Sequence, residues 1–195
     1  MEAKGEITPD PDAKLMLRVR DGDQKCFQDL FVRHSPALVG FVDRFFRNRA
    51  VAEEVVQEVF LKVYRARKSY QIRSKFTTWL YTIATRTCYN ELRRGVHRAK
   101  FQALEESSPK HTRSAESSAQ QDLEARRLAE LVDRTLQNLP ENQRSAFMLV
   151  RFGGRSYAEV AEILDLGLSA VKSLVFRATD AVRQALAAHE VEKEK

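Results

Sequence analysis

Aromatic and basic side chains alternate through the stretch FTTWLYTIATRTCYNELRRG, residues 76–95. Aromatic rings stack on unpaired bases while Arg and Lys side chains follow the phosphates, so this mixture is typical of proteins that bind single-stranded nucleic acid. The surrounding charge agrees with that chemistry, because residues 61–100 contain 11 Lys or Arg and a single acid, Glu91. Such a block on a folded surface attracts phosphate. The pattern therefore predicts a nucleic-acid surface in the first half of the chain.

Two alternatives stay open for these residues. The basic side chains could form an ordinary solvated face, and the rings could belong to a helical core, where large aromatics contribute most of the buried area. For Trp79 the sequence supports stacking and burial equally, whereas for Tyr81 it favours burial.

A second group of residues, EILDLGLSAVKSLVFRA at 162–178, has the apolar spacing of two helices that meet at a sharp corner. The first of these helices is predicted to begin at SYAE, residues 156–159, as a capping box. Ala161 is small where the helices cross, Asp165 tolerates the left-handed conformation at the corner, and Val171 can lock the crossing. This spacing favours a helix-turn-helix, although such corners also occur as pure structure.

Polar and aromatic side chains at the start of the second helix favour the DNA-binding interpretation, because that part of a recognition helix meets base edges. They are Lys172, Ser173, Phe176 and Arg177. We therefore predict that the last third of the chain binds duplex DNA.

The sequence shows no pattern that predicts catalysis. We find no paired nucleophile and base, no phosphate-binding loop and no metal-ligand spacing, so we expect no enzyme activity, no cofactor and no metal site. Cys26 and Cys88 lie in apolar helical patterns and are predicted to be buried free thiols. His34 is expected to be a packed residue at the edge of the core, because no second ligand stands at the right spacing.

Helices must position both groups of residues. Apolar side chains recur every three or four positions through residues 12–94 and again from Leu123. Within the first of these ranges, RARKSYQIRSK at 65–75 is polar, basic and without this period, so it is predicted to be a loop. EESSPKHTRSAESSAQQ at 105–121 is also polar and lacks the period. The sequence therefore predicts an all-α protein with two small helical domains joined by a flexible linker. The predicted segments are an N-terminal tail (1–11), a first domain (12–97), the linker (98–122), a second domain with the helix-turn-helix (123–188) and a charged tail (189–195).

Composition narrows the class of protein further. The 195 residues include only 7 Gly and 5 Pro, too few for the many turns of an all-β fold. The net charge of +6 suits a polyanionic partner. No stretch has the length and apolar character of a membrane span, and the acidic N-terminus does not look like a secretory signal. We expect a cytoplasmic protein without membrane insertion.

The order of motifs along the whole chain resembles the extracytoplasmic-function (ECF) group of bacterial sigma factors. The resemblance rests on FxxLFxxHxxxLxxFxxRF, AEEVVQEVFLKVY, FTTWLYTIA with NELRR, LPENQRSAFML, and SYAEVAEIL with AVKSLVFRA. It implies that residues 12–97 are sigma region 2 and residues 123–188 are sigma region 4. It also implies a protein that binds the RNA polymerase core and directs it to promoter DNA.

The resemblance implies three surfaces. Region 2 is expected to dock on the clamp helices of the polymerase beta-prime subunit through Glu53, Glu54, Gln57, Glu58 and Phe60. It is expected to melt and read the minus-ten element through Arg73, Lys75, Phe76, Trp79, Arg86, Asn90, Arg93 and Arg94. Region 4 is expected to sit on the flap of the beta subunit and read the minus-thirty-five element through Ser156, Lys172, Ser173, Phe176 and Arg177. An anti-sigma factor is the further partner that the resemblance implies.

The chain departs from the family pattern at several of these positions. Arg86 stands where the family often has Asn, beside the base-capturing pocket. Ala170 and Leu174 stand where Thr and Arg are usual, and Thr179 replaces a basic residue. The changes at positions 170, 174 and 179 remove phosphate contacts from the second domain. Each lost contact flattens the salt dependence of DNA binding by about 0.9 in log–log slope.

Two other functions compete with the sigma-factor interpretation. A stand-alone helix-turn-helix regulator would explain residues 139–186 but gives no role to the first domain. A degenerate sigma-like interaction protein would explain why acidic and basic residues balance in residues 127–195, at 10 each.

Overall fold

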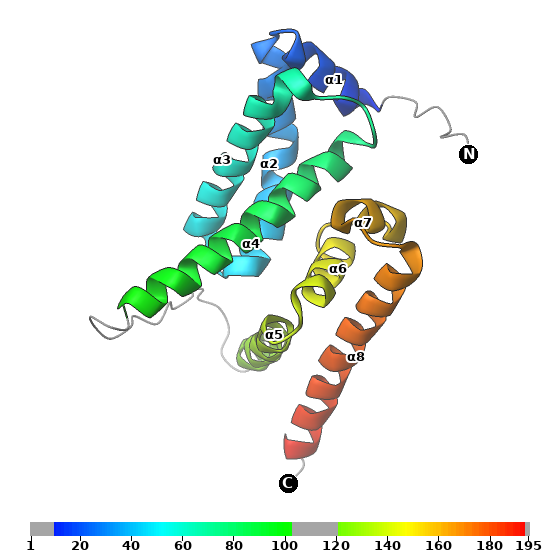
Figure 1. Ribbon diagram of the computed structural model, residues 1–195. Coiled ribbons are helices and arrows are strands. Elements are labelled where there is room, and N and C mark those ends of the chain that lie inside the picture. Colours follow the sequence, from blue (N-terminus) through cyan, green and yellow to red (C-terminus); the bar gives the residue numbers. More distant parts are fainter. Residues whose placement is uncertain (1–9, 103–120, 194–195) are drawn as a thin grey trace. The chain divides into compact units, whose positions relative to one another are not determined.

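The computed structural model describes residues 10–102 and 121–193, with side chains described in 10–95 and 124–191. These residues form helices and contain no strand, and they divide into two compact units (Figure 1). The prediction of an all-α fold with two helical domains is confirmed. None of the helices described is both long and apolar enough to cross a bilayer.

The first unit is built from four helices and one short 3-10 turn. They are α1 (Pro11–Arg20), α2 (Gln24–Phe46), α3 (Arg49–Ala66), η1 (Arg67–Ser69) and α4 (Phe76–Gln102). Helix α2 packs against α1, α3 and α4, and α3 also packs against α4 (Figure 1). The core is made by the apolar stripes of these helices, in which Leu38, Phe41 and Val59 are at most 1% exposed. Burial of each such side chain contributes about 1.5–3 kcal/mol.

Local signals set the helix boundaries in this unit. Asp23 caps α2 by accepting from the amide of Cys26 at 3.1 Å, and Asn48 caps α3 through the amides of Ala50 and Val51. Both cysteines are buried and free, as predicted. The Cys26 thiol also donates to Asp23 at 3.2 Å.

The predicted linker, residues 98–122, is helical at both ends. Helix α4 continues to Gln102, because no proline interrupts the chain between Gly95 and that point, and α5 begins at Gln121. Residues 103–120 lie outside the described residues, as do residues 1–9 of the predicted N-terminal tail. Of the predicted C-terminal tail, residues 189–193 belong to the last helix and residues 194–195 lie outside.

The second unit contains α5 (Gln121–Gln137), α6 (Glu141–Arg151), α7 (Tyr157–Leu164) and α8 (Leu168–Lys193). Helix α8 is long and packs against the other three. Buried apolar side chains fill the space between them, including Met148, Leu149 and Val160, each at most 1% exposed. This arrangement leaves the first turns of α8 as the second helix of a helix-turn-helix.

The corner between α7 and α8 has the predicted geometry. The Ser156 amide donates to the Glu159 carboxylate at 2.9 Å, and the Glu159 amide donates to the Ser156 hydroxyl at 3.2 Å, which completes the capping box. Asp165 adopts the left-handed conformation, with φ +55° and ψ +50°. The amide of Leu166 donates to the carbonyl of Ala161 at 2.9 Å, which closes the end of α7 as a Schellman turn.

Candidate nucleic-acid and polymerase-binding surfaces

A pocket of about 290 Å³ lies where the loop of residues 70–75, which follows η1, meets the start of α4. Its walls come from the end of α3, η1, the loop and α4, and its lining residues are Ala66, Ser69, Tyr70, Gln71, Arg73, Ser74 and Trp79. Two of the predicted minus-ten residues, Arg73 and Trp79, are therefore brought together. A ring, a guanidinium and several hydroxyl or amide groups around one hollow can stack on a base and hydrogen-bond its edge.

Trp79 is partly buried, and two other rings hold it in place. Its ring centroid lies 4.8 Å from that of Tyr70 and 6.0 Å from that of Phe76, in tilted arrangements that aromatic pairs favour. One part of the indole is thus packed and another part lines the pocket. Part of the ring is packed and part is accessible, so stacking of Trp79 on a base stays a prediction, and Tyr81 is buried as favoured, at 5% exposure.

Phe76 does not present its ring to a nucleic acid. It is 0% exposed and its centroid lies 5.4 Å from that of the His34 ring. Because a ring without exposed surface cannot stack on a base, the Phe76 ring is not placed to do so in this structure, and its predicted contact with minus-ten DNA stays untested. The helical period alone did not separate Phe76 from Trp79, since residues three apart lie on the same side of a helix.

Tyr70 forms one wall of this pocket, although the sequence pattern gave no sign of it. Its side chain is 4% exposed, and its hydroxyl has no hydrogen-bond partner in the described part of the protein. Burial, reinforced by the charge of Asp10, raises the pKa of Tyr70 to about 12. The phenol is therefore neutral at physiological pH, and its hydroxyl is buried.

The remaining predicted minus-ten residues lie along one side of α4 or beside its start. At about 100° per residue, positions 79, 86, 90 and 93 project from the same side of a helix. Arg86, Asn90 and Arg93 are exposed there. Arg94 is exposed and pairs with Glu91 at 3.3 Å, and Lys75 is exposed in the loop before the helix. The pocket and this polar, cationic side therefore face the same side of α4, about two helical turns apart.

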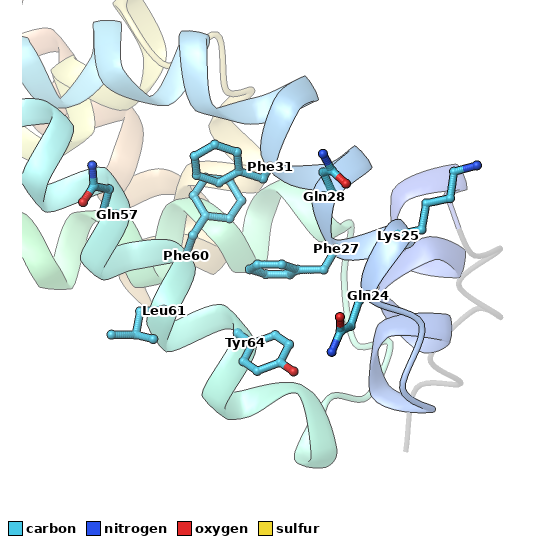
Figure 2. Close-up of a pocket in the computed structure, with 9 residues that line it drawn as sticks. All are labelled: Gln24, Lys25, Phe27, Gln28, Phe31, Gln57, Phe60, Leu61 and Tyr64. Carbon is cyan, nitrogen blue, oxygen red and sulfur yellow. The ribbon is translucent and has the colours of Figure 1, made fainter.

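An apolar groove of about 630 Å³ lies between α2 and α3 (Figure 2). Figure 2 shows the rings that gather in it, and the residues lining it are Gln24, Lys25, Phe27, Gln28, Phe31, Gln57, Phe60, Leu61 and Tyr64. The Phe31 and Phe60 centroids are 4.8 Å apart, and those of Phe27 and Tyr64 are 5.0 Å apart. Phe31 is 36% exposed and Leu61 is 46% exposed, which is unusual for large apolar side chains that serve only the core.

Two of the five predicted polymerase-binding residues, Gln57 and Phe60, line this groove, and the three acids lie elsewhere on the same helix, α3. Phe60 itself is only 2% exposed and acts as a wall behind Phe31. Glu54 is exposed on α3. Glu53 is also exposed and pairs with Arg49 at 2.8 Å, whereas Glu58 is half-buried and pairs with Lys62 at 2.9 Å. The α2 contribution was missed, because the period of α2 assigned Phe27 and Phe31 to the buried stripe.

The start of α8 presents a mixed polar and apolar face. Lys172, Ser173 and Arg177 are exposed there, and Phe176 is 70% exposed. Val171 and Val175 face inward at 0% and 3% exposure, so the helix is anchored by one side and free on the other. Ser156 is exposed but its hydroxyl already donates to Glu159 at 2.9 Å.

The three departures from the family pattern in the second unit also lie on or near this face. Ala170 is exposed and Leu174 is half-buried, so neither offers a charged group. The Thr179 hydroxyl donates to the Val175 carbonyl at 2.8 Å within the helix. The described side chains contain no cluster of three His, Cys, Asp or Glu residues that could hold a metal ion. His34 lies 2.9 Å from Asp12 through its Nε2 atom.

Comparison with known proteins places these surfaces in a family. The Sigma-70 region 2 profile matches residues 30–98, and the Sigma-70, region 4 profile matches residues 129–191. The chain is 33% identical over 188 residues to the RNA polymerase sigma-H factor of Pseudomonas aeruginosa, across 92% of this chain and 96% of that protein. It is 35% identical over 176 residues to the ECF RNA polymerase sigma-E factor of Escherichia coli strain K12, across 88% and 92% of the two chains.

Two solved structures share the fold. CnrH in complex with the cytosolic domain of CnrY has a TM-score of 0.69 and 25% identity, over 92% of this chain and 99% of the other. The sigma factor RpoE in complex with the anti-sigma factor NepR from Bartonella quintana has a TM-score of 0.61 and 25% identity, over 84% and 98% of the chains.

The chain belongs to the ECF RNA polymerase sigma factors, with sigma-70 regions 2 and 4. It directs RNA polymerase to promoters and is not an enzyme. Sigma factors bind the polymerase core and promoter DNA, and this chain contains both sigma-70 region 2 and region 4. The alternative function, a stand-alone helix-turn-helix regulator, would not explain why residues 30–98 match sigma-70 region 2.

Proposed function

We propose that the first unit captures an unpaired base of the minus-ten element in the pocket beside Trp79. The observation that carries this proposal is the position of that pocket. It opens at the start of α4, next to Arg73, and the exposed side chains of Arg86, Asn90 and Arg93 continue from it along the helix. The base would stack on the indole while the cations follow the phosphates of the same strand. We assign this role to the domain predicted at residues 12–97.

The energies involved are of the right size for a short bubble. Opening the duplex costs about 1.4 kcal/mol of stacking per base-pair step. One base stacked on an aromatic side chain recovers about 1–3 kcal/mol. A single pocket therefore balances one or two steps, and phosphate contacts from Lys75, Arg86 and Arg93 supply the remainder.

The test separates promoter binding from promoter opening. Holoenzyme is reconstituted from core polymerase and the full chain, and a promoter is obtained by run-off transcription from genomic fragments. Permanganate reactivity of unpaired thymines then measures opening, and a filter or mobility assay measures initial binding. We expect Trp79→Ala to reduce opening more than initial binding, and Trp79→Phe to retain most of the opening because it keeps a ring.

A different result would assign Trp79 to the core. If Trp79→Ala reduced binding and opening equally, and also lowered the melting temperature, the indole would serve packing and the pocket would not read DNA. The melting temperature of each variant is therefore measured alongside.

We further propose that the groove between α2 and α3 docks on the clamp helices of the polymerase beta-prime subunit. Exposed Phe31 and Leu61 offer apolar surface and Gln57 lines the groove, while Glu54 and Glu58 lie on the same helix, α3. An amphipathic helix laid into a groove uses this combination of apolar anchors and a polar rim. The mixture also fits an interface that must form and dissociate, as interfaces with polar rims do.

The second unit, predicted at residues 123–188, is proposed to sit on the flap of the beta subunit and read the minus-thirty-five element as duplex. Lys172, Ser173, Phe176 and Arg177 are exposed at the start of α8, where a recognition helix meets base edges. Phe176 suits a thymine methyl group, and Arg177 suits a guanine edge or a phosphate. With Ala170 and Leu174 beside them, this unit depends on polymerase for its affinity.

We also propose regulation by an anti-sigma factor. Both solved structures reported above are complexes, one with the cytosolic domain of CnrY and one with the anti-sigma factor NepR. A protein that must reach core polymerase and promoter DNA acts in the bacterial cytoplasm, which is where we propose this chain works. Co-purification from cells before and after induction would detect the partner, and a chain always found with polymerase alone would contradict this proposal.

A further inference from the structure

Helix α4 begins without a cap of its own. The carbonyl of Lys75 accepts from the amide of Trp79 at 3.2 Å, so Lys75 occupies the N-cap position. A lysine side chain has no acceptor and cannot satisfy the free amides of the first turn. The first helical amide, that of Phe76, must find an acceptor elsewhere.

That acceptor is Asp10, 66 residues earlier in the chain. Its Oδ2 accepts from the Phe76 amide at 2.9 Å, and its Oδ1 accepts from the amide of Ala13 at 2.8 Å, where Asp10 is the N-cap of α1. One carboxylate therefore caps two helices at once. Its negative charge also suits the positive ends of both helix dipoles.

The capped residue is the one that positions Trp79. Phe76 is fully buried, with its ring against those of Trp79 and His34. The Nε2 atom of His34 in turn lies 2.9 Å from a carboxylate oxygen of Asp12 on α1. Two acids at the start of α1, Asp10 and Asp12, therefore contact this region. Asp10 also acts on the pocket wall electrostatically, because its charge helps to raise the pKa of Tyr70.

We propose that Asp10 is a positioning residue for the minus-ten pocket, joining α1 to the first turn of α4 so that Trp79 and the preceding loop are held ready for the base. This inference rests on the proposed reading of minus-ten DNA at that pocket. Loss of the Asp10–Phe76 contact frees the first turn of α4, which lets the indole and the residues before it move. Promoter opening is therefore reduced by more than the lost folding stability alone would explain.

Two variants at Asp10 separate the contacts. Asp10→Ala removes both caps. Asp10→Asn retains one oxygen for the Ala13 amide, and Asn is as good an N-cap as Asp, but its amide nitrogen then faces the Phe76 amide and cannot accept from it. Asp10→Asn therefore keeps α1 and removes the link to α4, and it carries the test if Asp10→Ala does not fold.

Asp23→Ala is the matched control. Asp23 caps α2 with the same local geometry, accepting from Cys26 three residues later, and it also pairs with Arg18 at 2.6 Å. Its loss should lower stability at least as much as a change at Asp10. It has no contact with α4 among the bonds described, so it should leave the pocket unaltered.

The first measurement uses the free protein. Trp79 is the only tryptophan in the chain, so intrinsic fluorescence reports on this pocket alone. Acrylamide quenching should increase in Asp10→Asn and Asp10→Ala and stay at the wild-type value in Asp23→Ala. Equal quenching in the wild type and in Asp10→Asn would overturn the proposal, because the contact would then not control the indole.

The second measurement uses holoenzyme on the promoter described above. The Asp10 variants should reduce the equilibrium for opening by about tenfold, the change that loss of one charge-assisted hydrogen bond can cause. Core binding and the Asp23→Ala control should stay near the wild-type values. If Trp79→Ala impairs opening but the Asp10 variants behave like Asp23→Ala, the inference about Asp10 fails while the function of the pocket stands. If Trp79→Ala leaves opening unchanged, the proposed function itself fails.

Discussion

The corner of the helix-turn-helix allows one quantitative prediction. Asp165 has φ +55° and ψ +50°, a left-handed conformation that costs an L-residue about 1–2 kcal/mol and glycine almost nothing. Its side chain is exposed, so a substitution loses no packing. Asp165→Gly therefore relieves the backbone, while the greater freedom of glycine in the unfolded chain costs about 0.5–1 kcal/mol.

The middle values of these two ranges, about 1.5 and about 0.75 kcal/mol, leave a gain of about 0.75 kcal/mol in the free energy of unfolding of the second unit. For a unit of this size the gain corresponds to a rise of roughly 3–6 °C in melting temperature. The charge of Asp165 contributes little, because it lies near both the end of α7 and the start of α8, where the helix dipoles act in opposite directions. Asp165→Asn should therefore stay close to the wild type.

The assay is urea unfolding followed by two signals. Trp79 fluorescence reports on the first unit, and far-ultraviolet circular dichroism reports on all helices, so a change confined to the second unit alters only the latter. Asp165→Ala is the control for the backbone, because alanine keeps the conformational cost and should not stabilise the unit. The reasoning is refuted if Asp165→Gly leaves the midpoint unchanged, or if Asp165→Asn stabilises the unit as much as glycine does.

Two further predictions concern the first unit. Glu54→Lys combined with Gln57→Ala should weaken binding to core polymerase. The melting temperature should not fall, because both side chains are exposed on α3. An unchanged affinity in a pull-down titration would show that the docking surface lies elsewhere. Burial raises the pKa of Tyr70 from 10.0 to about 12, so its contribution to stability is complete below the unfolded value of 10.0 and is lost as pH rises through about 12. Urea midpoints across that range should fall more steeply for the wild type than for Tyr70→Phe, and parallel curves would argue against a buried phenol.

Features that depend on neighbours in the sequence could be predicted. The capping box at Ser156, the left-handed Asp165 and the inward Val171 all follow from rules that act within a few residues. The exposed positions of α8 could be identified for the same reason, since a helix with one buried stripe exposes the other side.

Features that depend on distant parts of the chain could not be predicted. Nothing near Asp10 indicates that it caps α4, because the partner is 66 residues away. Phe76 and Trp79 share one side of α4, and only the packing of Tyr70 and His34 decides which of the two rings is fully buried. Likewise Phe31 follows the apolar period of α2, but α3 covers it incompletely and leaves part of the groove open.

Site-specific crosslinking tests the central claim most directly, namely that two separate surfaces read two promoter elements. A benzoylphenylalanine replaces Ser74, which lines the pocket, in one variant and Phe176, on the exposed side of α8, in another. In holoenzyme on its promoter, the probe at position 74 should crosslink to the unpaired non-template strand of the minus-ten element once the duplex opens. The probe at position 176 should crosslink to the minus-thirty-five duplex both before and after opening. Crosslinks from position 74 that reach only polymerase or duplex DNA, and do not change on opening, would contradict the account.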